Sequence, residues 1–273
     1  MSLDEKYHKL QQILINLDSA VVAFSGGVDS TLLLKVACDS LGSEKVLALT
    51  AISPIFPAYE IEQTQQLARD FGVRLQLIAT DELALDTFVE NSPQRCYHCK
   101  HHLFGLFLQE VRKVGFATLL DGSNLDDLND YRPGKAALEQ LNILSPLREA
   151  EFSKQDIRDL SQRLGLSTWN KQPFACLATR FPYGTKITAE RLKQIDSCES
   201  WLRKNGFLNY RVRYHHSLAR VEVAPDEIPR LLDEQLRLAL VAAFKQNGFD
   251  YITLDLQGYR SGSMNEVLSQ TTC

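Results

Sequence analysis

A glycine turn between an apolar run and a helical pattern constrains this chain more than any other feature. Residues 20–24 are all apolar, and residues 31–37 repeat apolar side chains at helical spacing. Gly26 and Gly27 stand between them, and two adjacent glycines let the backbone curl so that several N–H groups point into one concavity. The helix that follows adds the positive end of its dipole at the same place. We therefore predict a strand, a tight turn and a helix that together hold a phosphate or pyrophosphate.

The full string of the turn adds specificity. It reads Ser25-Gly26-Gly27-Val28-Asp29-Ser30-Thr31, and it matches neither the G-x-x-x-x-G-K-[ST] phosphate loop nor the G-x-G-x-x-G dinucleotide fingerprint. It resembles the loop of ATP pyrophosphatases, which split ATP into AMP and pyrophosphate. We expect all seven residues to bind the nucleotide, with a catalytic role for Asp29. The alternative is an ordinary strand-to-helix turn with a serine at the helix start.

Length and composition describe a globular protein with a core. The chain has 273 residues, which is enough for two domains, and 44% of them are hydrophobic. Its net charge is −4 at pH 7, no apolar stretch approaches a membrane span, and the N-terminus lacks the core of a signal peptide. We therefore expect a cytoplasmic protein that binds neither nucleic acid nor a membrane. Disulfides are not expected there, so the six cysteines need another explanation.

Strand and helix patterns alternate along the first part of the chain. Strands are predicted at 20–24, 46–51, 73–78 and 117–121, and helices at 4–18, 29–41, 57–71, 100–114 and 153–164. This order predicts an α/β fold with a doubly wound parallel sheet. The glycine turn would lie at the carboxyl end of the first strand, where such sheets bind ligands. We expect this ATP pyrophosphatase (PP-loop) domain to span residues 1–168.

Two further segments are predicted. Residues 169–188 contain Pro173, Pro182 and Gly184, which prevent a regular element, and such a loop inside a compact protein is usually functional. Residues 189–273 are expected to form a smaller α+β domain for substrate binding and oligomerisation. Its predicted elements are helices at 187–204 and 226–246 and strands at 210–215, 218–223 and 251–256.

An acidic segment follows the fourth predicted strand, at the same edge of the sheet as the turn. Asp126, Asp127 and Asp130 offer carboxylates that can hold Mg²⁺ against the phosphates of ATP, and Arg132 can neutralise charge there. The alternative is a solvated polar loop.

Three cysteines draw attention. Cys96 and Cys99 form a C-x-x-C pair where the loop after the third strand enters a helix, flanked by basic residues, and Cys176 lies in the 169–188 loop. The pair allows a thioredoxin-like redox site, a zinc site completed by nearby histidines under strain, or, with Cys176, three thiolates for a [4Fe–4S] cluster with one open iron. Buried structural cysteines are the fourth possibility. Cys38 is expected in the core, and Cys198 and Cys273 carry no flanking motif.

Two arginines mark the second domain. Arg211 and Arg213 would project from one face of a strand, because side chains alternate along it, with Glu222 on the neighbouring strand. Paired guanidinium groups can clamp a phosphate or carboxylate of a substrate. A solvent-facing strand face joined by salt bridges is the alternative.

Taken together, the motifs resemble the LarE family of ATP-dependent sulfur transferases over nearly the whole chain. The motifs that carry the resemblance are Ser25-Gly26-Gly27-Val28-Asp29-Ser30, Arg95-Cys96-Tyr97-His98-Cys99-Lys100, Ser145-Pro146-Leu147, Cys176-Leu177-Ala178-Thr179-Arg180-Phe181-Pro182-Tyr183-Gly184 and Arg211-Val212-Arg213. The resemblance implies adenylation of each carboxylate of pyridinium-3,5-biscarboxylic acid mononucleotide, followed by replacement of AMP with sulfur. The product belongs to the synthesis of the nickel-pincer nucleotide cofactor of lactate racemase.

The resemblance also implies roles for single residues. Cys176 matches the cysteine that supplies sulfur, and is left as dehydroalanine, in members that have only that cysteine. Because this chain also has Cys96 and Cys99, it resembles the three-cysteine members, in which the trio binds a [4Fe–4S] cluster and a sulfide on the open iron is transferred. Arg180, Arg211, Arg213 and Glu222 match positions near the substrate or a metal. The expected partners are a small-molecule nucleotide and further copies of the chain in a homo-oligomer.

Three other functions remain open at this point. A tRNA thiolase shares the ATP loop and the cysteines, but it predicts a basic groove or an added RNA-binding domain. An amide-forming synthetase would use ammonia as nucleophile and keep its cysteines for structure. A nucleotide-sensing module would carry out no chemistry, and pyrophosphate release separates it from the enzymes.

Overall fold

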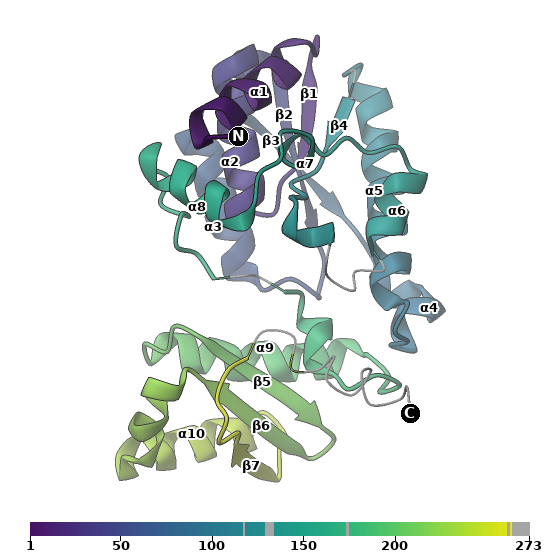
Figure 1. Cartoon of the computed structure of the whole chain (residues 1–273). Helices are drawn as coiled ribbons and strands as arrows, with labels where there is room; N and C mark the ends of the chain where they lie inside the picture. Colours follow the sequence, from purple (N-terminus) through teal and green to yellow (C-terminus); the bar gives the residue numbers. More distant parts are fainter. Residues whose placement is uncertain (117, 129–133, 173–174, 261–262, 264–273) are drawn as a thin grey trace, which may run out of the picture. The chain divides into compact units, whose positions relative to one another are not determined.

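The computed structural model describes residues 1–116, 118–128, 134–172, 175–260 and 263 (Figure 1). It divides into two compact units. The first contains Met1–Glu82 and Pro93–Phe174, and the second contains Leu83–Ser92 and Ala175–Cys273. This division differs from the expected 1–168, 169–188 and 189–273, because residues 83–92 join the second unit. There the carbonyls of Val89 and Asn91 accept hydrogen bonds from the backbone of Ile187 and Gly184, each 3.0 Å long.

The first unit is built on a sheet of four parallel strands. These are β1 (Ala20–Ala23), β2 (Val46–Ile52), β3 (Arg74–Ala79) and β4 (Thr118–Leu120), in the order β3-β2-β1-β4. The parallel α/β sheet predicted from the alternating pattern is thus confirmed. Residue 117, the predicted start of the fourth strand, lies outside the described residues.

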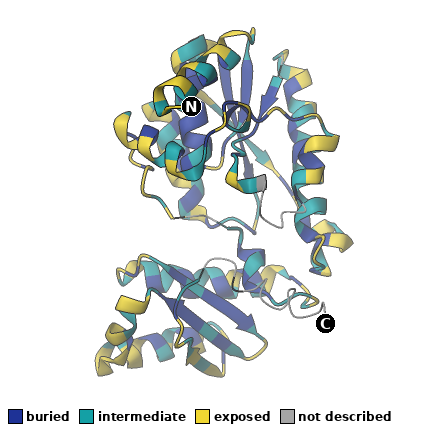
Figure 2. Cartoon of the chain, viewed as in Figure 1, coloured by how far each residue is buried: buried dark blue, intermediate teal, exposed yellow. Residues whose placement is uncertain are grey.

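Helices cover both faces of this sheet (Figure 1). One core joins Ala20 and Val22 of β1 to the helices α1 (Leu3–Ile15), α2 (Val28–Leu41), α3 (Ala58–Asp70) and α8 (Lys154–Arg163). Val21, which points to the opposite face, packs in a second core with α5 (Arg95–Val114) and α6 (Gly134–Gln140). The strands β1 and β2 are therefore buried between two helical layers (Figure 2). Because both faces of the sheet are covered, a ligand can reach these strands only at the edges of the sheet.

Short elements complete the first unit, and one helix start corrects the prediction. The short pieces are η1 (Ser43–Lys45), η2 (Glu82–Ala84), which runs into the second unit, η3 (Asp126–Leu128) and α7 (Pro146–Glu149). Helix α5 begins at Arg95 instead of residue 100. Cys96 and Cys99 therefore lie inside the helix, whereas they were predicted in the loop that enters it. Helix α8 starts with a capping box formed by Ser153 and Asp156.

The second unit is a small α+β fold, as predicted. Its sheet has the order β5-β6-β7, in which β5 (Tyr210–His215) and β6 (Leu218–Val223) form an antiparallel hairpin and β7 (Tyr251–Leu254) pairs parallel with β6. Its other elements are α4 (Asp86–Val89), η4 (Leu177–Arg180), α9 (Ala189–Lys204), η5 (Pro225–Leu232) and α10 (Glu234–Gln246).

The single helix predicted at 226–246 is wrong. The segment forms η5 and then α10, separated at Asp233. Pro229 lies inside the first piece, where it lacks an N–H for helical hydrogen bonding. Asp233 starts the second piece, because its side chain accepts a hydrogen bond of 2.9 Å from the backbone N of Leu236. Among the described residues, the helices are too short or too polar to traverse a lipid bilayer.

Candidate active site

The glycine turn connects β1 to α2, as predicted. Gly26 is buried and has a φ of +68°, a left-handed conformation that favours glycine. A Cβ added at Gly26 would lie 2.6 Å from Oγ1 of Thr64 on α3, so the position also lacks space for a side chain. Gly27 is the N-cap of α2 and makes no side-chain cap. The first N–H groups of the helix therefore face the turn without a capping side chain, as an anion site requires.

The hydroxyls of the turn occupy different places. Ser25 is exposed, and its Oγ lies 3.1 Å from Oγ of the buried Ser30. Ser30 Oγ also accepts a hydrogen bond of 3.3 Å from the backbone N of Ser25. Thr31 is fully buried, and its Oγ1 has no hydrogen-bond partner among the described residues. Ser25 is thus the hydroxyl that is open to a ligand in this structure.

Asp29 lies in the first turn of α2 and is held from two directions. Nζ of Lys154, at the start of α8, lies 2.7 and 2.6 Å from its two carboxylate oxygens. Nδ2 of Asn124, after β4, donates to Oδ1 at 3.4 Å. A Cβ on Gly122 would lie only 3.1 Å from the backbone N of Ser30. Close approach of the two backbones thus brings the ends of β1 and β4 to one edge.

The acidic segment organises its own backbone. Asp121 accepts hydrogen bonds from the hydroxyls of Ser123 and Ser145. Asp126 accepts from the backbone N of Lys154 at 2.6 Å, and Asp127 from the backbone N of Asn124 at 3.0 Å. In the described ranges, no three His, Cys, Asp or Glu side chains gather where they could hold a metal ion. Asp130 and Arg132, which were predicted to act here, lie outside the described residues.

The backbone carbonyls of the turn are contacted by residues that the sequence analysis did not single out. Nζ of Lys171 donates to the carbonyl of Gly26 at 3.2 Å, to Glu60 Oε2 at 2.6 Å and to Gln63 Oε1 at 3.0 Å. Oγ1 of Thr64 lies 3.5 Å from the carbonyl of Ser25. Contacts between residues more than 30 positions apart leave no local pattern, so periodicity and motif spacing carried no signal for them.

The predicted cysteine trio is divided between the two units. Cys96 and Cys99 lie three residues apart in the first turns of α5 and are both half-buried, and Nη2 of Arg95 lies 3.7 Å from Sγ of Cys96. Residues at this spacing share one side of a helix. Cys176 belongs to the second unit, where it precedes η4 and is also half-buried. Nη1 of Arg180 donates to the carbonyl of Cys176 at 3.1 Å, so a guanidinium group lies next to this residue.

The remaining described cysteines belong to the interior. Cys38 and Cys198 are buried, and burial raises the pKa of their thiols to about 11 and about 12. Thiols with such pKa values are poor nucleophiles and metal ligands at neutral pH, so the assignment of Cys38 to the core is confirmed. Cys273 lies outside the described residues.

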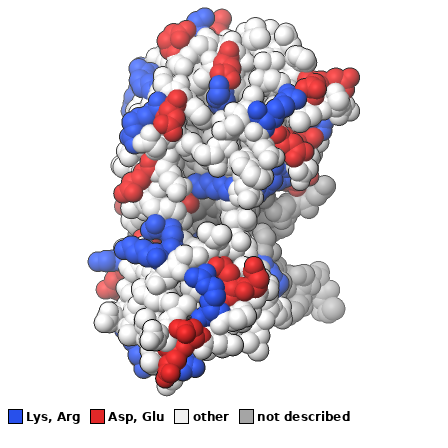
Figure 3. All heavy atoms as spheres, turned by 90° about the vertical axis from the view of Figure 1, so that its left-hand side faces the viewer, with Lys and Arg blue, Asp and Glu red and all other residues white. Residues whose placement is uncertain are grey.

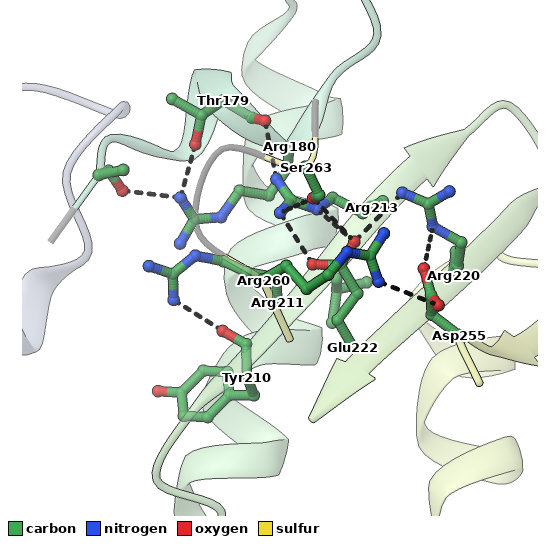
Figure 4. A network of polar contacts seen from close by, with 12 residues as sticks. Thr179, Arg180, Tyr210, Arg211, Arg213, Arg220, Glu222, Asp255, Arg260 and Ser263 are labelled. Carbon is green, nitrogen blue, oxygen red and sulfur yellow. Dashed lines mark hydrogen bonds and ion pairs between the residues drawn. The ribbon is translucent and has the colours of Figure 1, made fainter. Parts of the chain in front are cut away.

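A cluster of arginines occupies the second unit (Figure 4). Arg180 is 2% exposed and forms a bidentate pair with Glu199, with both N–O distances 2.9 Å. Burial by itself raises the pKa of Glu199, but the charges of Arg180 and Arg211 and a hydrogen bond from the backbone N of Val212 hold it below its ordinary value. Glu199 is therefore a carboxylate at neutral pH.

Arg213 and Glu222 form a second buried pair. Their N–O distances are 3.0 and 2.8 Å, and Arg213 also donates to the carbonyl of Thr179 at 3.1 Å. Because Arg213 is 4% and Glu222 0% exposed, the alternative of a solvent-facing strand face is wrong here. Glu222 also accepts from Arg220 at 3.1 Å. Its oxygens are thus counter-ions of guanidinium groups, which does not favour the metal role suggested for it.

Positive charge exceeds negative charge in this cluster. Its five guanidinium groups belong to Arg180, Arg211, Arg213, Arg220 and Arg260, and its three carboxylates to Glu199, Glu222 and Asp255. Burial, followed by the charge of Arg180, lowers the pKa of Arg211. Arg211 donates to the carbonyl of Tyr210 at 2.7 Å and lies over the ring of Tyr259. A partly buried cluster with two excess positive charges suits an anionic ligand.

The fold and the turn define an ATP-pyrophosphatase-type (PP-loop) enzyme. A family model described as NAD synthase matches residues 6–99, which contain the turn. An NH₃-dependent NAD⁺ synthetase of Pyrococcus horikoshii is 36% identical over 74 residues, which cover 27% of this chain and 28% of that protein. The family model thus stops well before Cys176 and the arginine cluster.

Two relatives match almost the whole chain. An uncharacterised protein of Synechocystis is 42% identical over 268 residues, covering 98% of this chain and all of that protein. The pyridinium-3,5-bisthiocarboxylic acid mononucleotide synthase of Lactiplantibacillus plantarum is 39% identical over 269 residues, covering 98% and 97%. The chain therefore belongs to the LarE family of ATP-dependent sulfur transferases, and the resemblance seen in its motifs is confirmed.

Proposed function

We propose that this enzyme adenylates the carboxylates of pyridinium-3,5-biscarboxylic acid mononucleotide with ATP and converts them to thiocarboxylates. The observation that carries the proposal is the 39% identity, across both units, to a synthase of the bisthiocarboxylic acid. Because the similarity covers 98% of the chain, it is not limited to the segment around the ATP turn.

The chemistry explains why ATP is needed. A carboxylate is a poor electrophile, because its oxygen is a poor leaving group. Attack of that oxygen on the α-phosphorus of ATP forms an acyl adenylate and releases pyrophosphate. A sulfur nucleophile then attacks the acyl carbon, and AMP leaves with the oxygen. The uncapped N–H groups of the turn stabilise negative charge that develops on the transferring phosphoryl group.

Mg²⁺ fits the first unit through Asp29. Magnesium bound to ATP takes most of its ligands from phosphates and water and needs only one or two carboxylates. Asp29 supplies a carboxylate at the mouth of the turn, at present paired with Lys154. When bound, the ion would neutralise phosphate charge and favour departure of pyrophosphate.

The arginine cluster supports the choice of an anionic substrate. The proposed substrate carries a phosphate and two carboxylates, and Arg211 belongs to a cluster with excess positive charge. Arg180 and Arg213 are held by Glu199 and Glu222, so they are pre-positioned before a ligand arrives. Positions fixed in advance reduce the entropy lost on binding.

Cys96, Cys99 and Cys176 together are proposed to hold a [4Fe–4S] cluster. The donors suit it, because Cys96 and Cys99 share one side of α5 and all three cysteines are half-buried. Three thiolates would leave one iron open to carry the sulfide that is transferred. Otherwise Cys176 itself is the sulfur donor. The reducing cytoplasm, our proposed location, keeps such thiols available.

We also propose a homo-oligomer. Among the described residues of the second unit, the large apolar side chains of Leu208, Leu232, Leu238, Tyr251 and Leu256 are at least 60% exposed. Contact with another chain would remove this apolar surface from water, which is favourable. Sedimentation of the purified protein tests this: a species larger than a monomer is expected.

An amide-forming synthetase is the second candidate, because the NAD synthase match covers residues 6–99. An amide-forming synthetase would incorporate nitrogen into its product. It does not explain why the similarity to the bisthiocarboxylic acid synthase extends over the second unit. A tRNA thiolase is disfavoured by the net charge of −4, and on the face drawn in Figure 3 basic and acidic side chains are interspersed.

The experiment that tests the proposal identifies the products of ATP. With the pyridinium mononucleotide present, AMP and pyrophosphate are expected, and Asp29→Ala should strongly reduce pyrophosphate release while circular dichroism shows an intact fold. Formation of ADP and phosphate would contradict the proposal.

A further inference from the structure

Lys171 forms a three-fold contact that neither the motifs nor the proposed chemistry explain. Its ammonium group has three N–H donors, and the structure gives it three acceptors: Gly26, Glu60 and Gln63. The Lys171 and Glu60 side chains are only 18% and 7% exposed. A lysine that lies 145 positions after the glycine turn thus reaches the backbone of the turn from a largely buried position.

The contact fixes the direction of a peptide group. In a trans peptide, the C=O and the following N–H point in opposite directions. Lys171 holds the carbonyl of Gly26, and Thr64 lies 3.5 Å from that of Ser25. The N–H groups of Gly26 and Gly27 are consequently directed away from Lys171 and α3. The backbone N of Gly27 donates a hydrogen bond of 3.4 Å to Oγ of Ser25, the exposed hydroxyl of the turn.

A glycine pair needs such a restraint. Glycine takes positive and negative φ with similar ease, so the peptide between Gly26 and Gly27 has little intrinsic preference for one orientation. An N–H that points at the ligand only part of the time binds it more weakly, in proportion to the population of the competent state. A hydrogen bond that fixes the Gly26 carbonyl prevents this loss of affinity, although the donor of that bond does not contact the ligand.

We propose that Lys171 is a positioning residue for ATP, which holds the Gly26 carbonyl so that the Gly27 N–H faces the phosphates. The inference rests on the ATP role of the turn. The lysine acts through the backbone, because Glu60 balances its charge. This distinguishes it from a lysine that attracts phosphate directly, and from an ion pair that only fastens residues 169–171 to α3.

The test compares four variants of the full-length protein. Lys171→Met keeps the length of the side chain and removes the donors, and Glu60→Gln keeps an acceptor and removes the charge. The double variant combines them, and Lys35→Met, which breaks the surface pair with Asp39 on α2, is the control. The readouts are the Kd for Mg·ATP by calorimetry, the KM values for ATP and for the pyridinium substrate, and hydrogen exchange of the turn without ATP.

The proposal predicts a specific pattern. Lys171→Met should raise the Kd and KM for ATP about tenfold, equivalent to about 1.4 kcal/mol, leave the KM for the pyridinium substrate unchanged and accelerate amide exchange at residues 24–28. The double variant should remain as weak as Lys171→Met, because balancing the charge does not restore the lost hydrogen bond. Lys35→Met should match the parent.

Three results would overturn it. An unchanged ATP Kd in folded Lys171→Met would show a purely structural ion pair. Recovery of ATP binding in the double variant would show that Lys171 only neutralises Glu60. If Lys171→Met does not fold, Lys171→Leu, which also lacks a donor, would refute the proposal in its place if it kept parental ATP affinity. Failure of the parent itself to bind Mg·ATP would instead contradict the ATP role of the turn.

Discussion

At the scale of single residues, the ATP turn depends on two restraints with different physical origins. Gly26 has a backbone conformation that favours glycine and no room for a Cβ beside Thr64. Asp29 depends on partners, because Lys154 contacts both of its oxygens. Substituting Gly26 therefore tests the backbone conformation of the turn, and substituting Asp29 tests the role of its carboxylate charge.

Gly26→Ala is expected to cost more stability than the same change at Gly72. Both glycines have a positive φ, +68° and +61°, so alanine costs about 1–2 kcal/mol at either site. Only at Gly26 would the new Cβ meet another atom, Oγ1 of Thr64 at 2.6 Å, whereas nothing lies within 4 Å at Gly72. Urea denaturation should show the larger loss for Gly26→Ala, which should also lose ATP binding. Equal losses would show that the contact with Thr64 relaxes freely.

Arg211→Ala tests the anion site. A hydrogen bond to a charged group contributes roughly 1.5–3 kcal/mol, so the KM for the pyridinium mononucleotide should rise about 10- to 150-fold. The KM for ATP should change little, because the turn belongs to the other unit. Arg237→Ala, on the exposed side of α10, is the control. A parallel rise of both KM values would count against a separate substrate role.

At the scale of elements, buried ion pairs join the parts of the second unit. Glu199 of α9 binds Arg180 of η4 and the backbone of Val212 in β5, so one carboxylate connects three elements. Removing one partner of such a pair leaves an uncompensated buried charge, which typically costs 3–5 kcal/mol.

This carboxylate makes the stability of the second unit depend on pH. Because the pKa of Glu199 in the folded state lies below its ordinary 4.5, its contribution is complete above that value and is lost as the pH falls towards the folded-state pKa. Glu199→Gln should therefore lower stability at pH 7 and flatten the acid side of the stability profile. Glu139→Gln, in a surface pair, is the control. An unchanged slope in Glu199→Gln would contradict this account.

Local patterns predicted the elements better than the contacts between them. The strands at 210–215 and 218–223 were predicted with their observed bounds, because alternation of apolar and polar residues is a local signal. The start of α5 was missed because Arg95 to Lys100 is polar and shows no apolar period. The contacts of Lys171 and Lys154 with the turn depend on how helices pack, which no residue spacing encodes.

At the scale of the whole molecule, the proposed reaction uses residues of both units. The first contains the ATP turn, Cys96 and Cys99, and the second contains Cys176 and the arginine cluster. The NAD synthase model matches residues 6–99 and leaves residues 175–273 of the second unit unmatched, whereas similarity to the bisthiocarboxylic acid synthase covers 98% of the chain. The second unit is therefore where sulfur chemistry and amide chemistry are expected to diverge.

The proposed role of Cys96, Cys99 and Cys176 can be tested by measuring bound iron and sulfide. Protein purified without oxygen should contain iron and sulfide, and Cys96→Ala, Cys99→Ala and Cys176→Ala should each lose both, together with activity. Cys38→Ala, which removes a buried thiol, should retain them. If Cys176→Ala alone loses activity while the other two variants retain it, Cys176 is the sulfur donor. The mass of the parent protein should then fall by one H₂S per turnover.

Mass spectrometry of the pyridinium product shows whether this enzyme transfers sulfur to the carboxylates. The enzyme is incubated with ATP, Mg²⁺ and pyridinium-3,5-biscarboxylic acid mononucleotide under anaerobic conditions, and substrate and nucleotides are analysed together. We expect one carboxylate oxygen to be replaced by sulfur for each AMP and pyrophosphate formed. A product that has gained nitrogen in place of oxygen, or AMP formation that leaves the pyridinium compound unchanged, would contradict this expectation.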